Sequence, residues 1–223
     1  ATLRSRRRIV GLHRLRAVAA ETVPATTLLP RPAPEPPSAP GRVSVIIPTI
    51  DRYPWLATVL GQLASQTVAP HEVLVVDQTP LERRRDLGAE VPAGLPVRLF
   101  TSEVAGQCTA RNLALAEATG DLLLFLDDDY EVPADLLARH LARIEQTRAD
   151  ANCGIAVEAG EHDLDPAFRR FRQSDVFPTN NTLLCRDALL DTGLFDLAFD
   201  RGERADHDLG MRLYLGGRRL VLD

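Results

Sequence analysis

The sequence Leu122-Leu123-Leu124-Phe125-Leu126 is followed directly by Asp127-Asp128-Asp129. Five consecutive apolar residues between polar flanks are typical of a strand that is buried on both faces, as in the middle of a parallel sheet. Ligands of open α/β sheets bind at the carboxyl ends of the strands, where these three carboxylates stand. This stretch therefore predicts both the class of fold and the position of a site.

Short apolar runs alternate with helical patterns on both sides of this strand. Residues 43–47, 72–76 and 97–100 are the other predicted strands. The predicted helices start at Pro54, span 107–119 with Gly120 as the stop, and span 133–147. The first helix is expected to bury the face made of Trp55, Leu56, Val59, Leu60 and Leu63. The alternation predicts an α/β fold with a Rossmann-type, mostly parallel sheet flanked by helices.

The composition is that of a folded globular protein. The 223 residues are 45% hydrophobic and 26% charged, and no apolar run is long enough for a membrane span. Residues 1–40 carry seven Arg against two Glu, while the net charge of the whole chain is −5. The body is therefore acidic, which argues against nucleic acid as a partner. Cys108, Cys153 and Cys185 lack metal-type spacing and indicate a reducing, cytoplasmic compartment.

The chain divides into three predicted parts. Residues 1–23 form a basic amphipathic leader. Two interpretations of this leader are open: it contacts a membrane surface or a partner, or it is a solvated helix. Residues 24–41 form a Pro-rich linker, and residues 42–223 form the folded domain. The sequence starts without Met and ends inside the apolar run 220–222, so we expect it to be a truncated piece of a longer protein.

The acidic cluster at 127–129 indicates a metal. Together with Glu131 these carboxylates repel one another, and no basic residue stands beside them in the sequence. Oxygen ligands alone favour a hard ion such as Mg²⁺ or Mn²⁺, which bridges carboxylates to phosphates. The alternative is an acidic first turn of the next helix, which would complement its dipole. The sequence has neither a P-loop nor a G-x-G-x-x-G loop, so metal and side chains would have to hold a diphosphate.

An ordered set of motifs over residues 42–223 resembles glycosyltransferase family 2, whose members have the GT-A fold. The set consists of Val43-Ser44-Val45-Ile46-Ile47-Pro48-Thr49, Glu72-Val73-Leu74-Val75-Val76-Asp77, Ala110-Arg111-Asn112, Gly120-Asp121 followed by the acidic cluster, Asn180-Asn181, Gly193-Leu194-Phe195-Asp196, Ala205-Asp206-His207-Asp208-Leu209 and Gly216-Gly217. The resemblance implies transfer of a sugar from a nucleotide-diphosphate-sugar donor to a hydroxyl of a carbohydrate or other acceptor. It also implies inversion at the anomeric carbon and a need for Mg²⁺ or Mn²⁺.

The resemblance also assigns roles in donor and metal binding. Pro48 and Thr49 would line the nucleoside pocket, and Asp77 would accept a hydrogen bond from the base. Residues 127–129 occupy the position of the family's Asp-x-Asp motif, with Asp127 and Asp129 at the metal and Asp128 near the ribose of the donor.

Two further positions are expected to contact the substrates. Arg111 would reach the acidic cluster or the diphosphate, or would instead be a surface residue paired with Glu103 or Glu117. Asn181, after Asn180, would shape the floor under the donor sugar or acceptor. Residues 168–172 combine aromatic and basic side chains, which fits either contact with an anionic acceptor or a packed helix face.

Inverting transfer needs a base for the acceptor hydroxyl. Asp206 matches the Asp of the family's Glu-Asp pair, and its alternative role is the N-cap of a short helix. Ala205 stands where Glu is usual, so the second carboxylate would come from Glu203 or Asp208, or be dispensed with. His207 is interpreted as a local hydrogen-bonding residue, with a metal ligand as the alternative.

Two other functions fit part of the sequence. A sugar-phosphate nucleotidyltransferase also combines a parallel sheet, Mg²⁺ and paired Asp, but Pro48-Thr49-Ile50-Asp51 is not the Gly-rich basic loop such an enzyme would have. A non-catalytic nucleotide-sugar-binding relative is favoured by Ala205 alone.

Overall fold

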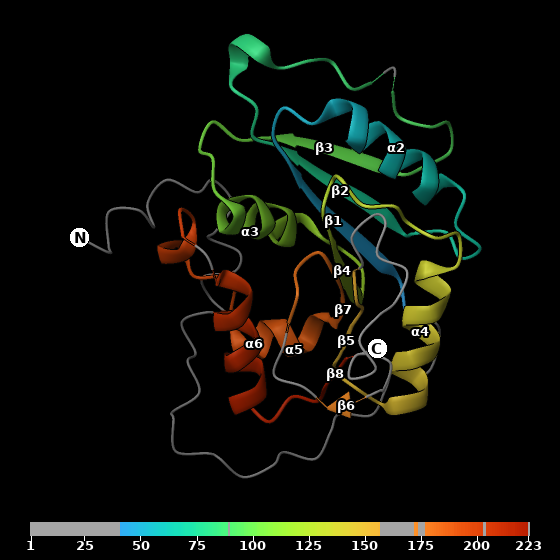
Figure 1. Cartoon of the computed structure of the whole chain (residues 1–223), viewed down its shortest axis with the longest axis vertical. Coiled ribbons are helices and arrows are strands. Elements are labelled where there is room, and N and C mark those ends of the chain that lie inside the picture. Colours follow the sequence, from blue (N-terminus) through green and yellow to red (C-terminus); the bar gives the residue numbers. More distant parts are fainter. Residues whose placement is uncertain (1–40, 89, 157–171, 174–176, 203, 223) are drawn as a thin grey trace.

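The computed structural model describes residues 41–88, 90–156, 172–173, 177–202 and 204–222 (Figure 1). The predicted leader 1–23, residues 24–40 of the predicted linker, the segment 168–171 and Glu203 lie outside these residues. The division of the chain into leader, linker and folded domain therefore stays a prediction.

The described residues form one mixed sheet with the strand order β3-β2-β1-β4-β7-β5-β8-β6. The strands are β1 (Val43–Thr49), β2 (Glu72–Asp77), β3 (Val97–Thr101), β4 (Leu122–Leu126), β5 (Ala151–Cys153), β6 (Arg172–Gln173), β7 (Asn181–Cys185) and β8 (Leu220–Leu222). Strands β6 and β7 run antiparallel to their neighbours, and the remaining pairs are parallel. The predicted Rossmann-type, mostly parallel sheet is confirmed.

Helices cover both faces of the sheet (Figure 1). The helices α2 (Tyr53–Ala64) and α4 (Leu136–Thr147) pack on one face, and α3 (Gln107–Glu117), α5 (Arg186–Thr192) and α6 (Ala205–Leu215) on the other. Because strand side chains alternate, Val45 and Ile47 of β1 pack with the first group, while Ile46 packs with the second. Burial on both faces explains why the central strands are apolar at nearly every position.

Helix α2 buries four of the five residues predicted for its inward face, Leu56, Val59, Leu60 and Leu63, but not Trp55. Trp55 is 57% exposed, whereas Tyr53 is buried together with Leu56 and Leu60. Tyr53 precedes Leu56 by three residues and Leu60 by seven, so it lies on the inward face. Its hydroxyl also finds a partner there, because it donates a hydrogen bond to Asp77 Oδ2 at 2.9 Å.

Two helix ends also differ from the prediction. Helix α4 begins at Leu136 rather than at 133, because the carbonyl groups of Pro133 and Ala134 accept hydrogen bonds from Gln66 Nε2 and Thr67 N at the end of α2. Helix α3 ends at Glu117, before the predicted stop at Gly120.

Gly120 has a packing role instead. A Cβ there would lie 2.5 Å from the carbonyl oxygen of Arg42 and 2.6 Å from Ser44 Oγ. The glycine therefore allows the chain to enter β4 in close contact with β1.

None of the three cysteines forms a disulfide with another. Burial raises the pKa of Cys108, Cys153 and Cys185 to about 12, so all three stay protonated and unreactive at neutral pH. Within the described residues, none of the helices combines the length and the apolar character needed to cross a bilayer.

Candidate active site

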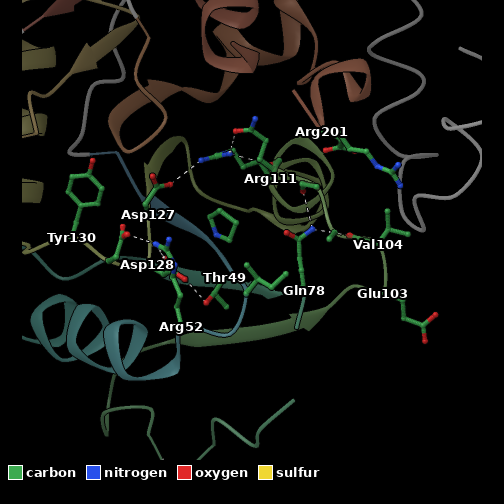
Figure 2. Close-up of a pocket in the computed structure, with 17 residues that line it drawn as sticks. Thr49, Arg52, Gln78, Glu103, Val104, Arg111, Asp127, Asp128, Tyr130 and Arg201 are labelled. Atoms are coloured by element: carbon green, nitrogen blue, oxygen red, sulfur yellow. Dashed lines mark hydrogen bonds and ion pairs between the residues drawn. The ribbon is translucent and has the colours of Figure 1, made fainter. Parts of the chain in front are cut away.

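A cleft of about 930 Å³ opens at the carboxyl ends of β1 and β4 (Figure 2). The chain runs from β1 outward to β2 and β3, then returns to place β4 on the other side of β1. The cleft thus lies at the point where the strand order reverses, as the general rule for open α/β sheets predicts. Its lining consists of Pro48, Thr49, Ile50, Arg52, Gln78, residues 103–107, Arg111, residues 127–130, Asp200 and Arg201.

Asp128 is the buried member of the acidic cluster. Thr49, the last residue of β1, donates a hydrogen bond from Oγ1 to Asp128 Oδ2 at 2.5 Å. Burial raises the pKa of Asp128, while this hydrogen bond acts in the opposite direction. The contact ties the ends of β1 and β4 together at the centre of the cleft.

Asp127 pairs with Arg111 of α3. Arg111 Nη2 lies 3.0 Å from Asp127 Oδ1, and Arg111 is only 4% exposed, so its predicted alternative as a surface residue is wrong. Glu117, one of the two partners considered for it, binds Arg98 instead. Burial raises the pKa of Asp127, and the charge of Arg111 opposes this shift.

Arg52 contacts the other two carboxylates. Its Nη1 forms a close ion pair with Asp129 Oδ2 and lies 3.5 Å from Asp128 Oδ1. Three carboxylates are thus met by the guanidinium groups of Arg52 and Arg111. The sequence argument that no basic residue offsets this cluster is therefore corrected, since both arginines are brought in by the fold.

The acidic cluster fits a divalent metal that arrives with a diphosphate. The side chains of Asp127 and Asp129 are 35% and 37% exposed, and both residues line the cleft. Among the described residues, no three His, Cys, Asp or Glu side chains are grouped so that they could hold a metal ion by themselves. Mg²⁺ at nucleotide sites typically needs only one or two carboxylates, because phosphate and water supply its other ligands.

The residues expected at the nucleoside lie at different depths. Pro48 and Thr49 line the cleft, but Asp77 is buried behind it. Its neighbour Gln78, which was not predicted, lines the cleft instead. Asp77 accepts hydrogen bonds from the Tyr53 hydroxyl at 2.9 Å and from the backbone N–H of Thr79 at 2.8 Å. The contact of Asp77 with a base therefore stays a prediction.

Gln78 is held with its amide nitrogen facing away from solvent. Nε2 donates to the carbonyl oxygens of Val104, at 2.9 Å, and Gly106, at 3.0 Å. These two bonds fix the loop that leads from β3 to α3 as one wall of the cleft (Figure 2).

Asn181 starts β7, opposite Leu126 in the sheet register. Its Oδ1 lies 2.9 Å from Nε2 of the buried His140, which holds the amide against α4. Its neighbour Asn180 donates a hydrogen bond to the hydroxyl of Tyr130, which lines the cleft. Both asparagines thus lie next to the carboxyl end of β4.

Asp206 lies in the first turn of α6 with its side chain 35% exposed. Its Oδ1 accepts hydrogen bonds from the backbone N–H of His207 at 2.8 Å and from His207 Nδ1 at 3.0 Å. The N-cap of α6 is Arg204, so the capping role considered for Asp206 is wrong. Burial lowers the pKa of Arg111, and the charges of Asp127 and Asp206 oppose this shift. Asp206 is not among the residues that line the cleft. Asp208, in contrast, binds Arg212.

The model of the family described as "Glycosyl transferase family 2" matches residues 44–195, which is more than half of the chain. The chain belongs to this family. The family model spans β1, the acidic cluster and β7, so it includes most of the lining of the cleft.

Curated relatives of this family 2 chain are glycosyltransferases by name. It is 33% identical over 89 residues to the uncharacterized glycosyltransferase YwdF of Bacillus subtilis. The aligned region covers 40% of this chain and 32% of YwdF. It is 32% identical over 107 residues to the amylovoran biosynthesis glycosyltransferase AmsB of Erwinia amylovora, covering 46% and 36% of the two chains. The chain thus spans about a third of the length of each relative.

Solved glycosyltransferases share its fold. S. aureus TarS 1–349 superimposes with a TM-score of 0.69 at 21% identity, over 82% of this chain and 58% of that one. The mannosyltransferase PcManGT from Pyrobaculum calidifontis, solved with GDP-Man and Mn²⁺, superimposes with a TM-score of 0.63 at 22% identity, over 92% and 65%. The predicted GT-A fold is confirmed by these likenesses.

The sequence analysis of this family 2 chain missed part of the cleft. Asp200 accepts a hydrogen bond from the backbone N–H of Thr109 at 2.7 Å, and a Cβ on Gly106 would lie 2.4 Å from the Asp200 carboxyl carbon. The loop before α6 is therefore pinned to the N-terminus of α3, with Arg201 lining the cleft (Figure 2). The pairing joins residues 91 positions apart, and nothing in the local sequence signals it.

Proposed function

We propose that this chain transfers a sugar from a nucleoside-diphosphate-sugar donor to a hydroxyl of a carbohydrate or other acceptor, with inversion and with Mn²⁺ or Mg²⁺. The observation that carries the proposal is the convergence of Thr49, Arg111 and three carboxylates in a cleft at the carboxyl ends of β1 and β4. TarS has been solved in complex with UDP-GlcNAc and PcManGT with GDP-Man and Mn²⁺, which supports a donor of this class.

The residues predicted from the sequence take the following roles in this proposal. Pro48, Thr49 and Asp77 surround the nucleoside, and Asp128 lies at the ribose. Arg111 is fixed by its burial and would face the diphosphate as a preorganised cation. Asn181 shapes the floor under the donor sugar or the acceptor.

The metal would be held by Asp127 and Asp129 together with the donor's phosphate oxygens. When bound, a divalent cation stabilises the negative charge that develops on the leaving diphosphate. Asp206 acts on the acceptor. Its carboxylate accepts the proton of the acceptor hydroxyl as the hydroxyl oxygen attacks the anomeric carbon of the donor sugar.

The three free thiols support a reducing location, and we propose the cytoplasm. Nucleic acid is not proposed as a partner, because the body of the chain is acidic. The basic leader 1–23 is the part for which membrane contact is proposed.

Turnover of a panel of UDP-, GDP- and dTDP-sugars tests the proposed activity. We expect release of a nucleoside diphosphate in Mn²⁺, with sugar transferred to an acceptor from a carbohydrate panel and the anomeric configuration of the product inverted in its NMR spectrum. Release of pyrophosphate from a nucleoside triphosphate and a sugar phosphate would identify a nucleotidyltransferase instead. Donor binding without turnover on any acceptor would favour a non-catalytic relative, for which Ala205 is the supporting observation.

A further inference from the structure

Arg52 holds an unusual position in the acidic cluster. It is the N-cap residue of α2, yet its side chain makes no capping hydrogen bond and reaches across the cleft to Asp128 and Asp129 (Figure 2). Its side chain is 49% exposed, whereas the other arginine of the cluster, Arg111, is buried. One guanidinium is thus fixed in the fold, and the other is held by ion pairs at the solvent side.

The Arg52 contacts involve oxygen atoms that a metal would need. Asp129 Oδ2 is occupied by Arg52, and Asp128 has one oxygen bonded to Thr49 and the other 3.5 Å from Arg52. A divalent ion that enters without a donor would have to displace this guanidinium or lie beside it. Since like charges repel, either arrangement weakens the binding of the metal alone.

The charge of the cluster leads to the same conclusion. Three carboxylates and two guanidinium groups leave one net negative charge, which a divalent ion alone would reverse. A diphosphate that enters with the ion brings negative charge that offsets the charge of the ion. It also offers Arg52 a new anionic partner. Arginine suits such an exchange, because its planar fork matches phosphate as well as carboxylate geometry.

We propose that Arg52 is an exchangeable counter-cation: it neutralises Asp128 and Asp129 when the cleft holds no donor, and it moves to the donor's diphosphate when a divalent metal takes Asp129. This inference rests on the proposed function. Its consequence is that metal and donor bind together, each poorly without the other. By linkage, UDP strengthens the binding of Mn²⁺ by the same factor as Mn²⁺ strengthens the binding of UDP.

Titration of the full chain with Mn²⁺, followed by the electron paramagnetic resonance signal of the free ion, tests this exchange. The measurement is made with and without UDP on the wild type, Arg52→Gln and Arg83→Gln. Arg83 is a matched control, because it pairs with Asp51 near the same helix end at 2.9 Å and does not line the cleft. We expect Arg52→Gln to bind Mn²⁺ alone about tenfold more tightly than the wild type, and the enhancement by UDP to fall by about the same factor.

Arg52→Lys separates charge from shape. It keeps the positive charge, so its affinity for Mn²⁺ alone is expected to stay near that of the wild type. If Arg52→Gln binds Mn²⁺ alone no better than the wild type, or if Arg52→Lys behaves like Arg52→Gln, the exchange is wrong. The proposed function survives either result as long as UDP strengthens Mn²⁺ binding to the wild type. If none of UDP, GDP and dTDP strengthens Mn²⁺ binding to the wild type, the proposed function itself fails, and the exchange fails with it.

Discussion

Asp206 is the residue on which the proposed chemistry depends. Asp206→Asn is expected to keep the fold and the donor affinity, because the amide oxygen can still accept the hydrogen bond from the His207 N–H. Turnover is expected to fall by roughly 100-fold or more, about 3 kcal/mol, because an amide cannot take up the acceptor's proton. Initial rates at saturating donor, with donor affinity measured separately, check this prediction.

Asp208 provides the contrast for that experiment. Its Oδ2 binds Arg212 Nε and Nη2 at 3.0 and 2.8 Å, and Arg212 in turn donates to the Leu194 carbonyl oxygen. Asp208→Asn is therefore expected to lower stability more than turnover. Near-normal turnover in Asp206→Asn together with its loss in Asp208→Asn would assign the base to the other carboxylate.

Glu72 predicts a pH dependence of stability. Burial alone would raise its pKa, but hydrogen bonds from the Thr119 N–H, Ser44 Oγ and Arg98 outweigh this and lower the pKa to about 2 from 4.5. Since the folded-state pKa lies below the unfolded one, the ionised carboxylate stabilises the fold above pH 4.5. This contribution, roughly 3 kcal/mol, is lost as the pH falls toward 2.

Urea unfolding of the wild type and Glu72→Gln across this pH range measures the contribution. The variant is expected to be less stable at neutral pH, and the difference in free energy of unfolding should shrink from pH 4.5 downward. A difference that stays constant from pH 7 to pH 2 would mean that the Glu72 carboxylate is not held in the ionised form by these partners.

At the scale of elements, two glycines are expected to respond oppositely to alanine. Gly120 lies where β4 begins against β1, and a Cβ there would lie 2.5 Å from the Arg42 carbonyl oxygen. Gly61 lies inside α2, and apart from its chain neighbours and the helix's own backbone nothing lies within 4 Å of an added Cβ. We expect Gly120→Ala to destabilise the fold by about 1–3 kcal/mol and Gly61→Ala to stabilise it by about 0.5–1 kcal/mol.

Thermal and urea unfolding of the two variants check this pair. Equal effects of both substitutions would show that the close approach of β4 to β1 is not what requires Gly120.

The strands β1, β2 and β4 could be predicted because they are buried on both faces. Their continuous apolar runs are a local signal, and β4 was predicted with the bounds Leu122–Leu126 that the structure shows. The strand β7, Asn181–Cys185, was not predicted, because it is a five-residue segment with polar residues that becomes a strand only by pairing between β4 and β5. Trp55 was misassigned for a related reason: helical spacing alone does not tell which of Tyr53 and Trp55, two residues apart, faces the sheet.

In the candidate site, too, some residues could be predicted from the local sequence and others could not. Thr49 and the acidic cluster were found because they directly follow buried strands. Arg52 was missed although it stands only three residues after the end of β1, because the direction of a long side chain cannot be read from its position. The contact of Asp200 with Thr109 depends on two distant loops meeting, which no local pattern encodes.

At the scale of the whole molecule, a sheet whose central strands are buried on both faces carries a polar cleft at the carboxyl ends of β1 and β4. The acidic cluster lies at the end of the most apolar strand, where burial raises the pKa of Asp127 and Asp128. Cation binding there should therefore weaken as the pH falls, starting above the usual range for aspartate. We propose that this cleft binds a nucleoside diphosphate through a divalent metal.

Calorimetric titration of the wild type and Asp129→Asn with UDP, GDP and dTDP, each in Mn²⁺ and in EDTA, tests that claim most directly. We expect one or more of the nucleotides to bind the wild type in Mn²⁺ at least tenfold more tightly than in EDTA. Asp129→Asn should lose most of this enhancement while its weaker binding in EDTA stays almost unchanged, because the substitution removes a metal ligand and not the nucleoside pocket. Equal affinity in Mn²⁺ and EDTA, or no binding of any of the three nucleotides, would contradict the account.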